Sequence, residues 1–125
     1  MSFEVIRGQG VPQSHLPFSP AVRAGQFVFV SGQASTDEKG GLILESFEAE
    51  MRRSMEHVKT ILRAAGLELR HVVQVRSYVT DPADLPEYNK LYREYFSEPF
   101  PARTTITKCL GKVKFEIDVV AYAGG

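Results

Sequence analysis

The sequence predicts an α+β domain in which a sheet of about six strands carries two helices on one face. Two observations favour this class. Apolar residues alternate with polar ones in several short segments, whereas in two longer segments they recur every three or four positions. The chain has 125 residues, the usual size of one domain, and no Gly/Ser-rich or Pro-rich linker divides it. We therefore expect residues 1–125 to form a single domain.

The first third of the chain is expected to form three strands and the loops between them. Residues 3–7 are a short candidate strand, and prolines make residues 11–20 irregular. Residues 21–31 predict a hairpin that turns at Ala24-Gly25. Its second strand is apolar on both sides, which is typical of a strand covered on both faces. A loop is expected over residues 32–45.

The longest periodic segment predicts a helix over residues 46–65. Ser46 is a plausible N-cap, and Gly66 lies where a left-handed C-terminal cap belongs. Methionines in an apolar stripe of such a helix are typical of core packing. The stripe, at spacings of three and four, consists of Phe47, Met51, Met55, Val58, Leu62 and Ala65.

The second half of the chain predicts the remaining strands and a second helix. The strands are expected over residues 71–80, 103–109 and 113–123. The helix is expected from Asp84 to Phe96, because Asp84-Leu85-Pro86-Glu87 has the residue order of a capping box with proline in the first turn. Its inward face would carry Leu85, Tyr88, Tyr92 and Tyr95.

The sheet face turned away from the helices combines aromatic and charged residues. Such a surface is too aromatic for a solvated face and too charged for the core of one chain. A subunit interface would bury the rings and pair the charges, so we expect a homo-oligomer. The residues concerned are Tyr78, Val120 and Tyr122 beside Arg76, Glu116 and Asp118.

Composition and charge exclude several classes of function. Fifteen Lys and Arg residues balance fifteen Asp and Glu residues, and a net charge of zero argues against a nucleic-acid partner. With one cysteine, Cys109, and three scattered histidines, the sequence has neither an internal disulfide nor a ligand set for a metal. No secretory signal and no apolar run of membrane-spanning length occur. We expect a cytoplasmic protein that needs no metal or cofactor.

One group of residues is suited to chemistry. Arg103 begins a strand directly after the rigid Phe100-Pro101 turn, and a fixed guanidinium can present its planar fork to a carboxylate. Glu116 follows on the polar side of the next strand, and the glycine of Ser31-Gly32 would let a ligand approach the backbone. On spacing alone, Arg103 is a partner in a structural ion pair or an anion anchor, and Glu116 by itself indicates a solvated or interface carboxylate.

Taken together, the motifs of this chain resemble the RidA/YjgF family of reactive-intermediate imine and enamine deaminases. The similarity runs from end to end and holds in order and spacing. It rests on residues 18–22 (FSPAV), 29–33 (FVSGQ), 61–67 (ILRAAGL), 88–89 (YN), 95–96 (YF), 100–105 (FPARTT) and 114–117 (KFEI).

The resemblance implies a chorismate-mutase-like fold, in which a mixed six-stranded sheet carries both helices on one face. It also implies a homotrimer with three pockets at the subunit clefts. The implied reaction is the hydrolysis of small reactive 2-enamine or 2-imine acids, such as 2-aminoacrylate, to a 2-oxo acid and ammonia. No cofactor and no metal are implied.

By the same resemblance, Arg103 would bind the substrate carboxylate and Glu116 would handle the attacking water. The pocket around them would be lined by Phe18, Ser31, Gly32, Asn89 and Thr105. Phe18 stands where the family has a tyrosine, so a hydroxyl is missing there. Thr105 stands where the family often has a cysteine, at a position expected to act mainly through its backbone.

Two other functions are compatible with the sequence. A non-catalytic module of the same fold could bind a small carboxylate such as a 2-oxo acid, and the missing hydroxyl at Phe18 favours this alternative. RNA cleavage, attributed to some relatives, is disfavoured by the zero net charge and by the lack of a histidine pair for ribose chemistry.

Overall fold

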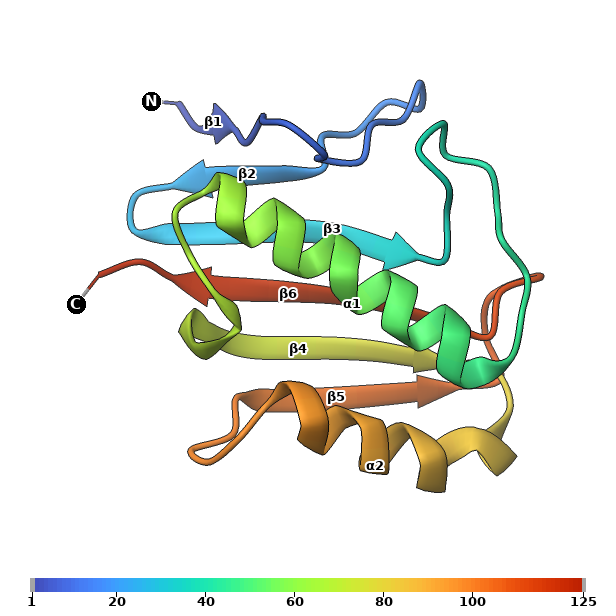
Figure 1. Cartoon of the computed structure of the whole chain (residues 1–125). Helices are drawn as coiled ribbons and strands as arrows, with labels where there is room; N and C mark the ends of the chain where they lie inside the picture. Colours follow the sequence, from blue (N-terminus) through green and yellow to red (C-terminus); the bar gives the residue numbers. More distant parts are fainter. Residues whose placement is uncertain (1, 125) are drawn as a thin grey trace.

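The computed structural model, which describes residues 2–124, contains one six-stranded sheet with two α-helices on one side (Figure 1). The expected α+β class with a mixed sheet is confirmed. Two single turns of 3₁₀ helix, η1 (Leu69–His71) and η2 (Pro82–Asp84), precede β4 and α2. The main elements are β1 (Glu4–Val5), β2 (Ala21–Ala24), β3 (Phe27–Ala34), α1 (Phe47–Ala64), β4 (Val72–Val79), α2 (Leu85–Tyr95), β5 (Ala102–Thr107) and β6 (Phe115–Tyr122).

The strands lie in the order β1-β2-β3-β6-β4-β5. All neighbours are antiparallel except β4 and β5, which are parallel because α2 returns the chain to the same end of the sheet. The last strand, β6, therefore lies in the middle, between β3 and β4. An irregularity in the β3–β6 ladder between Val30 and Gln33 falls on the predicted Ser31-Gly32 pair. Such bulges often re-aim side chains near functional sites.

The first helix begins and ends close to the predicted residues. The Ser46 side chain accepts a hydrogen bond of 3.2 Å from the Ala49 N–H, as an N-cap does. Gly66 follows the helix with a φ of +78°, a left-handed conformation that favours glycine. The predicted apolar stripe packs against β3 and β6, and its members are buried except for the half-buried Ala65 at its end.

The start of the second helix differs from the prediction. The capping box at Asp84 is wrong, because this residue has helical dihedral angles and its side chain caps nothing. Asp81 instead accepts a hydrogen bond of 2.9 Å from the Ala83 N–H and begins the preceding 3₁₀ turn. At its other end the helix stops at Tyr95, and the buried Phe96 is extended.

Two strand boundaries also differ. The predicted loop from residue 32 is wrong at its start, since β3 continues to Ala34 and carries Ser31 and Gly32 within the sheet. Conversely, β5 ends at Thr107 rather than 109. Lys108 and Leu110 have positive φ values of 58° and 67°, which no continuing strand can accommodate.

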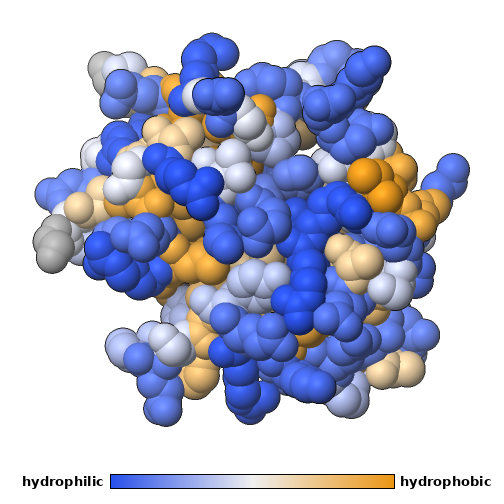
Figure 2. Space-filling model, in the orientation of Figure 1, coloured by the Kyte–Doolittle hydropathy of each residue, from blue (hydrophilic) through white to orange (hydrophobic). Residues whose placement is uncertain are grey.

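The two faces of the sheet have different surroundings. The helices and the sheet enclose the core, and the outer surface of the helix side is mainly hydrophilic (Figure 2). The opposite face of the sheet is open to solvent in a single chain. The sequence predicts that β3 is covered on both faces, and the chain itself covers only one of them. The large exposed apolar residues of β3, β4, β5 and β6 are Phe27, Phe29, Val73, Ile106 and Tyr122. Between residues 2 and 124, the structure has no helix whose length and apolar character would suit it to cross a membrane.

A buried carboxyl group fixes the start of β6. Glu50 of α1 is completely buried and accepts hydrogen bonds from the backbone N–H groups of Glu45 (3.0 Å) and Lys114 (2.8 Å). The Lys114 ammonium lies 3.4 Å from the same carboxyl group. These contacts join the loop before α1 to the residue that precedes β6, two positions before Glu116.

We expect Glu50→Gln to lower the free energy of unfolding by about 2 kcal/mol, because an amide NH₂ would face one of the two buried N–H donors. Urea denaturation measures the change. The matched control is Glu48→Gln, which removes an exposed ion pair with Arg52 on the same helix, a kind of contact worth at most about 0.5 kcal/mol. Equal losses in the two variants would contradict the anchoring role of Glu50.

Candidate functional site

Arg103 is the second residue of β5 and lies on the helix side of the sheet. It is in register with Val75 of β4, which is buried under the helices, and residues in register point to the same face. Its Nη1 donates a hydrogen bond of 2.9 Å to the side-chain oxygen of Asn89 on α2. Its guanidinium carbon lies 5.1 Å from the ring centre of Tyr88 and 4.7 Å from that of Tyr92.

These contacts leave an edge of the Arg103 guanidinium free. The two rings lie against its face, a cation–π arrangement worth about 0.5–2 kcal/mol that restrains the group. Within residues 2–124, no acidic side chain lies within 4.0 Å of its nitrogens. The structural ion pair that spacing left open is thus not formed in the described part of the chain. A restrained planar fork can bind a carboxylate through two hydrogen bonds at small entropic cost.

Thr105 lies two residues further along β5, on the same side as Arg103. Its hydroxyl oxygen is 3.0 Å from that of Tyr88, which is fully buried. The Tyr92 hydroxyl is also buried and has no partner among the described residues. Burial raises the pKa of Tyr92 to about 12, so this hydroxyl keeps its proton at neutral pH. Arg103, Asn89 and Thr105 are therefore close together over a floor formed by two tyrosines.

Glu116 lies on the opposite face of the sheet. It is in register with Tyr78 of β4 and Ala34 of β3, while its neighbours Phe115 and Ile117 point into the core. Alternation along the strand therefore directs the Glu116 side chain away from the helices.

The charges on this face are only partly paired. Asp118 accepts hydrogen bonds of 2.8 Å from Arg76 and from the Tyr78 hydroxyl. Glu116 has no hydrogen-bond or ion-pair partner among residues 2–124. Burial, and to a smaller extent the negative charge of Asp118, raise the pKa of Glu116 above its usual range. A half-buried carboxylate with a raised pKa and no partner is suited to accept a proton.

The remaining predicted residues lie on β3 and on the segment before β2, and Gly32 lies directly beside Glu116. Its carboxylate lies so close to Gly32 that a Cβ there would collide with Oε2. The Ser31 hydroxyl donates a hydrogen bond of 2.6 Å to the Ser19 carbonyl, and so it holds the segment that carries Phe18 against β3. Phe18 and Gly32 line one hollow of about 180 Å³.

The predicted residues thus form two groups that lie apart in one chain. β4 separates β5 from β6, and the two groups point to opposite faces. A small molecule bound to Arg103 is therefore out of reach of Glu116 of the same chain. The arginine group consists of Arg103, Asn89 and Thr105, and the glutamate group of Glu116, Gly32, Ser31 and Phe18.

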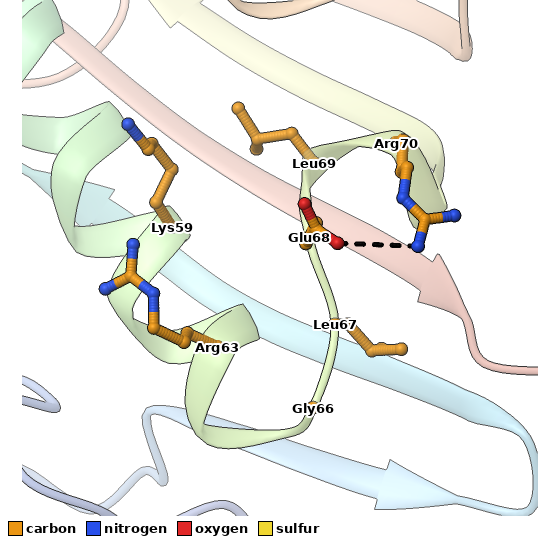
Figure 3. A pocket seen from close by; sticks show the side chains of 7 residues that line it. All are labelled: Lys59, Arg63, Gly66, Leu67, Glu68, Leu69 and Arg70. Atoms are coloured by element: carbon orange, nitrogen blue, oxygen red, sulfur yellow. Dashed lines mark hydrogen bonds and ion pairs between the residues drawn. The ribbon is translucent and has the colours of Figure 1, made fainter.

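A larger hollow, of about 550 Å³, contains no predicted site residue. It lies between the last turns of α1 and residues 66–70, with Lys59 and Arg63 on one side and the Glu68–Arg70 ion pair of 3.4 Å on the other (Figure 3). The side chains that line this hollow include three cations, and the one carboxylate among them, Glu68, is already paired with Arg70. No three His, Cys, Asp or Glu side chains that could hold a metal ion gather anywhere between residues 2 and 124.

Sequence reasoning missed the residues that orient the two candidate groups. The sequence predicts Tyr88 and Tyr92 as core residues, and they are buried, but their rings also support Arg103. Their spacing around Asn89 on one helix is the signal that indicates this second role. Asp118 is predicted as an interface residue, and it also raises the pKa of Glu116, its neighbour but one on β6.

Comparison with known proteins gives consistent matches along the chain. The family model described as endoribonuclease L-PSP matches residues 9–123. The chain is 37% identical over 122 residues to a RutC family protein of Pyrococcus horikoshii, covering 95% of this chain and 97% of that protein. It is 33% identical over 123 residues to the 2-iminobutanoate/2-iminopropanoate deaminase of Salmonella typhimurium, covering 94% and 96%. The crystal structure of E. coli TdcF with bound serine superposes with a TM-score of 0.87 at 30% identity, covering 97% and 99%.

Proposed function

This chain belongs to the endoribonuclease L-PSP (RidA/YjgF) family, and we propose that it hydrolyses small 2-imine or 2-enamine acids to a 2-oxo acid and ammonia. The observation that carries the proposal is the unpaired, aromatic-backed guanidinium of Arg103. The bound serine of E. coli TdcF, an amino acid with a carboxylate beside its nitrogen-bearing carbon, supports a ligand of this class. The deaminase of Salmonella typhimurium supports the reaction.

In the proposed reaction, Arg103 binds the substrate carboxylate and so fixes the imine carbon next to it. The reacting form is the protonated imine, which an enamine substrate reaches by taking up a proton at its C3 carbon. Glu116 takes a proton from water as the water oxygen attacks the imine carbon and the C=N electron pair moves to nitrogen, a general-base role worth about 10²–10⁴ in rate. The resulting carbinolamine loses ammonia when its nitrogen receives a proton and the hydroxyl loses one, which leaves the 2-oxo acid. The backbone of Gly32 and Thr105 orients the nitrogen end, and the Phe18 ring shields the pocket.

This reaction requires that the arginine group of one chain meet the glutamate group of another. We propose that the open sheet face forms the interface of a homotrimer, with one site at each subunit cleft. The exposed apolar rings Phe27, Phe29 and Tyr122 on that face support an interface, because burying them removes apolar surface from water. The opposite orientations of Arg103 and Glu116 support a site between chains.

RNA cleavage, which the family description names, has less support in this chain. His57 Nε2 lies 3.1 Å from the Thr36 hydroxyl, and His71 Nδ1 accepts a hydrogen bond of 3.0 Å from the Glu68 N–H. The two rings lie on different elements, α1 and η1, and their hydrogen-bond partners are Thr36 and Glu68, whereas that of Arg103 is Asn89. The zero net charge also provides no overall excess of cations to neutralise a phosphate backbone.

Subunit complementation tests the shared site. Chains with Arg103→Ala and chains with Glu116→Gln are each expected to be nearly inactive. Co-refolded in equal amounts, random assembly places an intact Arg103 beside an intact Glu116 in about one quarter of the clefts. We therefore expect the mixture to recover about one quarter of the wild-type rate of 2-oxo acid release.

The recovery separates the alternatives. If both groups acted within one chain, or if the chain were a monomer, mixing would restore nothing. Binding of a 2-oxo acid by the wild type without any acceleration of imine hydrolysis would instead identify a non-catalytic carboxylate-binding module.

A further inference from the structure

A second guanidinium shares the hollow beside Arg103. This hollow, of about 230 Å³, lies between α2 and the segment that leads into β5. Arg93 is exposed on α2, and its Nη1 donates a hydrogen bond of 3.3 Å to the backbone carbonyl of Asn89. The side-chain oxygen of the same Asn89 accepts the hydrogen bond from Arg103. Asn89 therefore accepts a hydrogen bond from each of the two guanidiniums that line the hollow.

Both cations lack an acidic partner. Among residues 2–124, neither Arg93 nor Arg103 has a carboxylate within 4.0 Å. Two like charges at one hollow repel each other, and a bound ligand with two negative charges would relieve that repulsion. Four of the other seven arginines form ion pairs, namely Arg52, Arg53, Arg70 and Arg76.

The other walls of the hollow are suited to a short carbon chain. Phe100 is about half exposed in the hollow, and Pro101 follows it. These two residues add an apolar surface to the hollow that Arg93 and Arg103 also line. The buried Tyr92 ring forms part of the lining, and its hydroxyl has no partner among the described residues. Two separated carboxylates joined by methylene groups match this arrangement better than a compact anion.

We propose that the preferred substrates are 2-imine acids with a second carboxylate at the far end of the side chain. Arg103 binds the carboxylate next to the imine, and Arg93 binds the distal one. This inference rests on the proposed function, in which Arg103 is the carboxylate anchor, and it adds a specificity-determining residue to that site.

Calorimetry with product analogues tests the inference. The probes are 2-oxoglutarate, which has two carboxylates, and 2-oxobutanoate, which has one. We expect wild-type protein to bind 2-oxoglutarate about tenfold more tightly, since a second charge-assisted pair contributes at a partly exposed site. Arg93→Ala should bring the ratio of the two dissociation constants close to one. The matched control is Lys90→Ala, which removes an exposed cation of α2 outside the hollow and should keep the wild-type ratio.

The outcomes separate this inference from the proposed function. Binding of 2-oxobutanoate with no preference for 2-oxoglutarate, or a preference that survives Arg93→Ala, would overturn the role of Arg93 and leave the deaminase proposal standing. Displacement of 2-oxoglutarate by equimolar inorganic phosphate would also overturn it, because the hollow would then be a general anion site. Failure to bind either 2-oxo acid would count against the proposed function itself.

Discussion

Arg103→Ala is expected to lower kcat/KM for imine hydrolysis by about two orders of magnitude, equivalent to about 3 kcal/mol. The substitution removes both hydrogen bonds to the substrate carboxylate and leaves that charge without a partner. It also removes the group that the rings of Tyr88 and Tyr92 support. The measurement is 2-oxo acid release from imines generated in situ by a serine or threonine dehydratase, after subtraction of uncatalysed hydrolysis.

Two further variants show which property of Arg103 matters. Arg103→Lys keeps the charge but loses the planar fork and the extended stacking, so we expect an intermediate loss of about tenfold. Arg70→Ala removes an exposed guanidinium that is paired with Glu68 and belongs to neither candidate group, and it should leave the rate unchanged. The anchoring role would be wrong if Arg103→Ala released 2-oxo acid at the wild-type rate while keeping the wild-type oligomeric state.

Local patterns were sufficient to predict the first helix, which packs on two of the strands that carry the candidate site. The α1 stripe and its Ser46 cap depend on residues within a few positions of one another, and both are confirmed. The Asp84 cap failed because Asp81 three residues earlier competes for the same turn and begins a 3₁₀ segment. A helix begins where a side chain accepts a hydrogen bond from a free backbone N–H. The spacing of residues alone does not show which of two neighbouring aspartates does so.

The separation of Arg103 from Glu116 could not be predicted from local patterns. Alternation along β6 already placed Glu116 on the outer face. The face occupied by Arg103 depends on the parallel register of β5 against β4, in which Arg103 is opposite Val75. A shift of one residue would turn Arg103 to the outer face, and only long-range pairing fixes that register. Sequence therefore indicates the candidate residues more readily than the face of the sheet on which each one lies.

The Tyr88 and Tyr92 rings show a second limit. An inward stripe on a helix and a floor under a ligand-binding arginine use the same residue types at the same spacing. Burial is identical in both roles, and only the position of β5 beside α2 distinguishes them. For this reason a prediction of core packing was confirmed and yet incomplete.

Glu116→Gln is expected to lower kcat by about 10²–10⁴, the usual effect of removing a general base. Glutamine fills the same space beside Gly32 but cannot take a proton from water. Loss of stability would not explain the defect. Burial raises the pKa of Glu116, so the folded chain binds that proton more tightly than the unfolded chain, and ionisation above the unfolded pKa costs stability. At neutral pH the glutamine variant should therefore resist urea at least as well as the wild type.

The dependence of the rate on pH gives the sharper test of Glu116. Only the ionised carboxylate can act as a base, so wild-type activity should fall as the pH is lowered through the raised pKa. The midpoint should lie above 4.5, the ordinary value for glutamate. Asp118→Asn removes the neighbouring negative charge and should move this midpoint to lower pH, while Glu116→Gln should abolish the transition altogether. A glutamine variant that kept the wild-type acid limb would assign the base to another group, because the proton that controls the rate would then reside elsewhere.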